Sequence, residues 1–111
     1  MQNVEFDRVL SVLHGWLGQP VSIGVEVTVQ PLQVAHMRGA LAAARDIAAP
    51  YDEAEFEFTV GTDAGFGLRR DYFHGAALFA ASGRLIVSLL DDFEEPEERV
   101  CAIVHIVGPP L

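Results

Sequence analysis

The most constraining feature of this sequence is an unbroken alternation of apolar and polar residues from Val21 to Val29. Every odd position holds valine or isoleucine, and the even positions hold serine, glycine, glutamate and threonine. Because successive side chains of a strand point to opposite faces, this period predicts a strand with one buried face and one in water. Residues Ala54 to Val60 alternate in the same way. The chain is therefore expected to fold mainly as β-sheet.

A different period opens the chain. Apolar residues that recur at steps of three and four line one face of a helix: Phe6, Val9, Leu10, Leu13 and Leu17. Asn3 is expected to cap the start of this helix, and Pro20 prevents its continuation. Trp16, near its end, is expected to seal the open end of a small barrel. The sequence thus predicts one N-terminal helix.

The stretch from residue 34 to residue 49 fits two interpretations. Met37 and Leu41 fit one face of a helix, and the alanines around them favour helix. Gly39 at the centre and the two-residue alternation around it favour a strand. We prefer a strand over residues 34–44, since it follows the preceding strand at the distance of a hairpin. A helix over residues 34–49, lying on the open sheet of an α+β fold, is the alternative.

The second half of the chain contains shorter apolar runs between turn residues. They predict strands over residues 66–71, 77–81, 85–90 and 100–107. The run 91–98 holds six carboxylates and a proline, which predicts a solvated loop. One helix and about six strands with close turns predict a single domain over residues 1–111, folded as a small antiparallel β-barrel.

Charge and cysteine content restrict the partners and the compartment. Sixteen acidic residues against seven arginines give a net charge of -9, which opposes binding to nucleic acid or to an anionic membrane. The single Cys101 excludes an internal disulfide and is expected to be a buried, inert thiol. The N-terminus has no secretory pattern, and no apolar run reaches the ~18 residues of a membrane span. The cytoplasm is therefore the expected location.

Two short motifs carry a resemblance to a known family. Leu17-Gly18-Gln19-Pro20-Val21 leads from the predicted helix into a strand, and Arg38-Gly39-Ala40-Leu41 places a glycine inside the next strand. On these motifs residues 5–60 resemble the Sm-like small barrels. The resemblance implies an SH3-type barrel whose open edge strands assemble related proteins into rings. It does not extend to RNA binding, because residues 46–52 lack the asparagine of that family's loop and Ser82-Gly83-Arg84 reverses its Arg-Gly pair.

The densest polar cluster is Arg69-Arg70-Asp71-Tyr72-Phe73-His74. Its guanidinium groups could hold an anionic ligand by forked hydrogen bonds, beside a phenol and an imidazole. If this segment is extended, one side carries Arg70, Tyr72 and His74, and the other carries Arg69 and Asp71. The same pattern is typical of a solvated strand end. The candidate ligand-binding residues are Arg69, Arg70, Tyr72 and His74.

No catalytic residue, metal ligand or cofactor is expected. The histidines at positions 14, 36, 74 and 105 do not have the spacing of a metal motif, and His105 in its apolar run is expected to be a core or interface residue. The serines lack a Gly-x-Ser-x-Gly setting, and the glycines lack the lysine of a phosphate-binding loop. The acidic run 91–98 has no glycine at which a calcium loop would turn.

These features favour a non-enzymatic, acidic protein-interaction module that self-associates as a homo-oligomer or binds a basic protein partner. Association is expected through edge strands, or through the apolar terminal strand and the helix. The alternative, from another class, is a small-molecule binder or minor enzyme with its site near residues 69–74. The two hypotheses differ in whether the side chains of that segment converge on a concavity.

Overall fold

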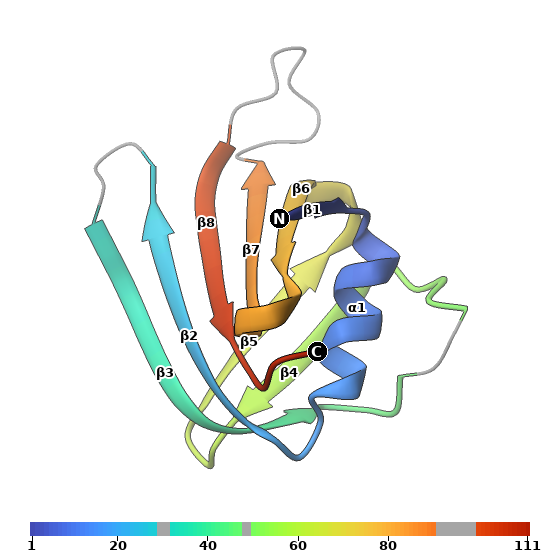
Figure 1. The fold of residues 1–111 in the computed structure, drawn as a ribbon, viewed down its shortest axis with the longest axis vertical. Coiled ribbons are helices and arrows are strands. Elements are labelled where there is room, and N and C mark those ends of the chain that lie inside the picture. The colour runs from blue at the N-terminus through green and yellow to red at the C-terminus, as the bar shows by residue number, and fades with distance from the viewer. Residues whose placement is uncertain (29–31, 48–49, 91–99) are drawn as a thin grey trace.

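The computed structural model describes residues 1–28, 32–47, 50–90 and 100–111, and in these ranges one helix packs on a curved sheet (Figure 1). The helix is α1 (Phe6–Gly15), and two short 3₁₀ turns are η1 (Arg70–Tyr72) and η2 (Ala80–Ser82). The strands of the described part are β1 (Gln2–Val4), β2 (Pro20–Val27), β3 (Leu32–Ala43), β4 (Glu55–Val60), β5 (Ala64–Arg69), β6 (Phe73–Phe79), β7 (Arg84–Leu90) and β8 (Val100–Val107). The acidic run 91–98 lies outside the described residues. No helix in these ranges is long and apolar enough to cross a membrane.

The eight strands of the described ranges form one antiparallel sheet in the order β1-β6-β7-β8-β2-β3-β4-β5. The prediction of a mainly β fold with one N-terminal helix is confirmed, but the closed barrel of about six strands is wrong. The sheet is open, with β1 and β5 at its two ends. In place of a closing strand pair, α1 packs its apolar face into the concave side, in one cluster with residues of β4, β5 and β6. The helix thereby buries the apolar surface that barrel closure would have buried.

Strand β3 connects two differently oriented parts of this sheet. Its first part pairs with β2, and its last three residues, from Leu41 to Ala43, pair with β4. Between them lies Gly39, whose φ of 154° favours glycine. A Cβ atom there would stand 2.8 Å from the Cα atom of Gly61, so only glycine lets the two chains approach this closely. The preferred strand over residues 34–44 is therefore confirmed, and the helical alternative is wrong.

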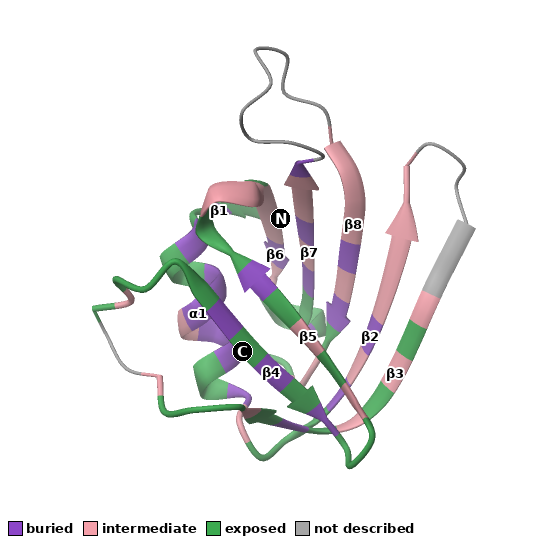
Figure 2. Cartoon of the chain, turned by 180° about the vertical axis from the view of Figure 1, so that it is seen from behind, coloured by how far each residue is buried: buried purple, intermediate pink, exposed green. Residues whose placement is uncertain are grey.

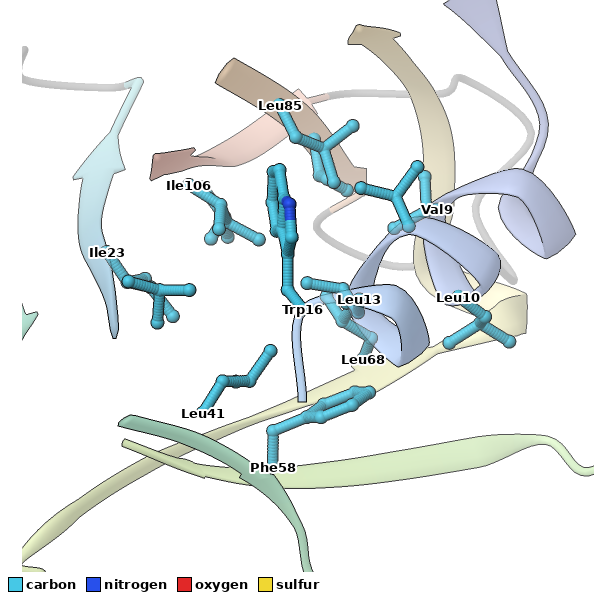
Figure 3. Packing of buried hydrophobic residues seen from close by; sticks show 14 of the residues in the cluster. Val9, Leu10, Leu13, Trp16, Ile23, Leu41, Phe58, Leu68, Leu85 and Ile106 are labelled. Carbon is cyan, nitrogen blue, oxygen red and sulfur yellow. The ribbon is translucent and has the colours of Figure 1, made fainter. Parts of the chain in front are cut away.

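The buried face of α1 is built from the helical period of the sequence: Phe6, Val9, Leu10, Val12 and Leu13. Asn3 does not cap this helix, because it lies in β1, and the N-cap residue Glu5 makes no side-chain cap bond. Trp16 follows the helix and is only 2% exposed, at the centre of the cluster in Figure 3. Its Nε1–H donates to the carbonyl oxygen of Pro109 at 3.0 Å, which ties the C-terminal segment to the core.

Strand β4 confirms its predicted alternation throughout, and β2 confirms it as far as Ile23. Val25 and Val27 are partly covered like their polar neighbours, and Val29 lies outside the described residues. In β4 the residues with even numbers from Phe56 to Val60 are buried, and those with odd numbers are exposed, as Figure 2 shows. In β2, Val21 and Ile23 are buried, whereas Ser22 and Gly24 are only partly covered. The sheet therefore has an inner face against α1 and an outer face on the opposite side.

Candidate functional site

The strand register defines which side chains share the outer face. His105 of β8 lies opposite Ile86 of β7 and Gly24 of β2, and these two lie opposite Ala77 of β6 and His36 of β3. Because paired residues of neighbouring strands point to the same side, these five positions form one row across the sheet. A second row runs through Gly75, Ser88, Ile103 and Glu26, and a third through Phe79, Arg84, Val107, Ser22 and Arg38. We call these three rows the outer face.

Apolar side chains lie next to one another on the outer face. Ile86, Ile103 and Ala77 are partly exposed, and Val107 is 45% exposed. Residues of the same strands that point inward are 0–4% exposed: Leu85, Val87, Val104 and Ile106. The helix and the β4–β5 hairpin lie on that inner side, as the two opposite views show (Figures 1 and 2). The outer side of β7 and β8 thus carries apolar side chains beside Arg84, Ser88 and His105, and the helix and the β4–β5 hairpin cover only the inner side.

A depression of about 310 Å³ lies on the outer face where Gly24 has no side chain. We call it the Gly24 depression. It is lined by Ser22, Gly24, Val25, Glu26, His36, His105 and Val107. The two imidazoles belong to the strands on either side of β2, so they flank the hollow. Its lining combines polar side chains with the apolar side chains of Val25 and Val107, an arrangement typical of a binding surface.

The polar groups of this depression are paired in two separate contacts. The Nε2 atom of His105 lies 3.2 Å from a carboxylate oxygen of Glu26. The Nε2 atom of His36 lies 3.2 Å from the Oγ atom of Ser22. The carboxylate and the hydroxyl are therefore bound to different imidazoles, and they do not form a single relay of the hydrolase type. Among the described residues, no group of three or more His, Cys, Asp or Glu side chains is placed to hold a metal ion.

The residues predicted to bind a ligand, from Arg69 to His74, do not follow the expected alternation. The 3₁₀ turn η1 covers Arg70 to Tyr72 and rotates the chain out of the extended conformation. Arg69 donates from Nε and one terminal nitrogen to both oxygens of Asp71, at 3.2 and 3.1 Å. This hydrogen bond raises the pKa of the Arg69 guanidinium above its ordinary value. Arg70, Tyr72 and His74 therefore do not share one side of an extended chain, as predicted. Instead, the guanidinium group of Arg69 lies beside the Tyr72 ring.

Arg69 and Tyr72 line a second depression, of about 320 Å³, between the end of β5 and the strands β7 and β8. The guanidinium carbon of Arg69 lies 5.2 Å from the centre of the Tyr72 ring. The other lining residues are Glu55, Gly67, Leu89, Leu90, Cys101 and Ala102. Cys101 is partly exposed here, so the expectation of a buried thiol is wrong. Because Arg69 already binds Asp71 through two nitrogens, an anion would have to compete for it.

The other two predicted residues lie elsewhere. Arg70 donates to a carboxylate oxygen of Asp7 at 2.9 Å and to the carbonyl oxygen of Tyr51, and its guanidinium covers the Phe6 ring at 4.8 Å. It therefore joins the start of α1 to the segment before β4, which is a structural role. His74 is exposed at the irregular register between Phe73 and Gly75. A ligand site near residues 69–74 stays a prediction, with two of its four residues brought together.

The Gly24 depression was not predicted from the sequence. The alternation shows that Ser22, Gly24 and Glu26 point to one side of β2. It cannot show that β8, about eighty positions further along, lies beside β2 with His105 opposite Gly24. One feature of the sequence could have indicated this surface: residues 100–107 are apolar at both alternating sets of positions, with His105 as the exception.

Comparison with known proteins adds no relative: no protein-family model, curated protein or solved structure matches this chain. The resemblance to Sm-like barrels therefore stays a prediction. The glycines of its two motifs have structural roles in this chain. The Gly18 N–H donates to the carbonyl oxygen of Leu41 at 2.7 Å, and Gly39 forms the bend in β3.

Proposed function

We propose that this chain is a non-enzymatic protein-interaction module that binds through the outer face of β6, β7, β8, β2 and β3. The observation that carries the proposal is the set of partly exposed apolar side chains on that face, above all Ile86 and Ile103. An antiparallel sheet that faces water on one side normally alternates apolar and polar residues, so apolar residues on the wet side need another reason. A contiguous apolar patch on a sheet typically marks a contact surface.

The charge distribution supports the same surface. The chain carries a net charge of -9, yet the described residues on the outer face include one carboxylate, Glu26, which is paired with His105. Two arginines, Arg38 and Arg84, lie at one border of the face. Interface centres are depleted in charge, and charged residues occupy their rims. The outer face has this composition, whereas the exposed side of β4 carries acidic residues.

The proposal can be tested by photo-crosslinking in the cells that make the protein. A photoreactive amino acid placed at Ile86 or Ile103 is expected to give discrete protein adducts on a denaturing gel. The matched control is the same amino acid at Thr62, an exposed position in the turn between β4 and β5. Adducts from the outer-face positions alone support the proposal. Absence of adducts from both positions, or equal yields at Thr62, contradicts it.

A further inference from the structure

The outer face has a shape that suggests its partner, and we infer that the partner is a second copy of this chain, with Ile86 of each copy seated in the Gly24 depression of the other. This inference rests on the proposed function and names its partner. Ile86 and Gly24 lie in the same row of the outer face, on either side of His105. One is a branched side chain, and the other is a position with no side chain.

A two-fold axis along β8 makes the two contacts equivalent. It places β7 of each copy over β2 of the other, because these two strands lie on either side of β8. Ile86 of each copy then stands over Gly24 of its partner, and both contacts form together. Such a self-complementary surface is the requirement for an isologous dimer. The strands of the two sheets would run nearly parallel, as in aligned sheet packing.

The hollow has room for the inserted side chain. The Gly24 depression has a volume of about 310 Å³. At about 30 Å³ for each water-sized group, the four carbon groups of the Ile86 side chain need roughly 120 Å³. His36 and His105 both line this space, so the isoleucine would lie beside their imidazoles.

The same operation places compatible groups together in the neighbouring rows. It brings β6 over β3, so the ring of Phe79 faces the guanidinium group of Arg38, a favourable cation–π pair. It also brings Ser88 over Glu26, a hydroxyl opposite a carboxylate. No carboxylate of the described outer face meets another carboxylate. This matters because two copies of a chain with a charge of -9 repel each other at most other surfaces.

The charge of the outer face also favours a second copy of the chain over a basic protein as its partner. A basic partner is attracted to carboxylates, and the exposed side of β4 carries Glu55 and Glu57. The outer face carries Arg38 and Arg84 against one paired carboxylate, so it does not attract a cation. A second copy, which meets this face with an identical face, satisfies both its apolar centre and its charges.

The small area that the two outer faces would bury predicts a weak, reversible dimer. Five strands at ~4.8 Å spacing and about seven residues at ~3.3 Å rise cover roughly 550 Å² per copy, or about 1,100 Å² in total. This lies at the small end of specific interfaces, where association is transient. The dimer is therefore expected at high protein concentration and absent in dilute solution.

Sedimentation equilibrium of the purified chain tests the inference. The mass is expected to rise from 12.1 kDa towards twice that value as the concentration rises from about 10 µM to about 1 mM, the range suited to a small interface. Ile86→Ala is expected to weaken association at least about tenfold, the loss that follows from removing part of one buried side chain at each of two contacts. Leu111→Ala is the matched control, because Leu111 is an exposed apolar residue outside the outer face. It is expected to leave association unchanged.

An isotope-filtered NMR experiment on mixed labelled and unlabelled protein tests the arrangement itself. Contacts between the Ile86 methyl groups of one copy and the Gly24 α-protons of the other support the inference even if Ile86→Ala is poorly folded. A monomer throughout the concentration range, or contacts through other strands, overturns it. If the chain is monomeric but the outer-face crosslinks give an adduct of another mass, the inference fails and the proposed function stands. If neither dimer nor adduct forms, both fail.

Discussion

Replacing Gly83 by alanine is expected to lower the free energy of unfolding by about 3 kcal/mol, because the change combines backbone strain with a backbone collision. Gly83 ends η2, before β7, with a φ of 66°, a conformation that alanine adopts poorly. A Cβ atom there would collide with the carbonyl oxygen of Gly108 and lie 2.6 Å from that of Pro109. Both atoms belong to the backbone and cannot rotate away. The variant would also disturb the bond from the Gly108 N–H to the Gly83 carbonyl oxygen, 2.8 Å long.

The matched control is Gly75→Ala, in β6. Gly75 has no positive φ, and a Cβ atom there would meet nothing within 4 Å. Its unfolding free energy is expected to change by less than about 0.5 kcal/mol, as for an unconstrained surface substitution. Equilibrium unfolding in urea measures both variants. Equal losses in the two variants would show that the C-terminal segment does not pack against Gly83 as described.

Trp16→Ala is expected to have the other large effect, a loss of about 3–5 kcal/mol, the usual cost of removing a buried aromatic side chain. Trp16 is 2% exposed, and it packs where α1 meets the strands of the inner face (Figure 3). Its indole also closes against Gly108, where a Cβ atom would approach the ring to 2.6 Å. The variant thus loses core volume and the attachment of the C-terminal segment together.

Trp16→Phe separates these two contributions. It keeps an aromatic ring but removes the Nε1–H that donates to Pro109, so part of the loss, about 1 kcal/mol, is expected from the hydrogen bond. The amide exchange of Leu111, which donates to the Ala80 carbonyl oxygen at 2.8 Å, should accelerate in both variants. If Trp16→Ala unfolds with wild-type free energy, the indole is not a core residue and the packing of α1 described here is incorrect.

Local patterns predicted individual elements well and their assembly poorly. The alternations in β2 and β4 and the helical period of α1 depend on residues close in sequence, so each was visible without a structure. Strand β1 has three residues, too few for a period, so Asn3 was expected to cap the helix, whereas it lies in a strand that pairs with β6. The closed barrel was inferred from the number of strands, the close turns and the lone N-terminal helix, but closure depends on which strands end the sheet. Strand order arises from long-range pairing that no local pattern specifies.

The candidate site shows the same limit. Arg69 to His74 attracted notice because they are neighbours in sequence, yet η1 directs Arg70 towards α1 and Arg69 towards Tyr72. Gly24 and His105 are far apart in sequence and become neighbours only through the pairing of β2 with β8. The alternation fixes the side of each strand on which a residue lies. It does not fix the register that turns separate strands into a surface.

The central claim is that the outer face is open to a partner, and solvent exposure of isoleucine methyl groups tests it most directly. A soluble paramagnetic agent added to dilute protein is expected to broaden the NMR signals of Ile86 and Ile103. The signals of Ile23 and Ile106, which are 0% exposed on the inner face, should remain sharp. At high concentration, the broadening of Ile86 should decrease as the dimer forms. If Ile86 and Ile103 are as protected in dilute solution as Ile23 and Ile106, the chain itself covers its outer face and the account is contradicted.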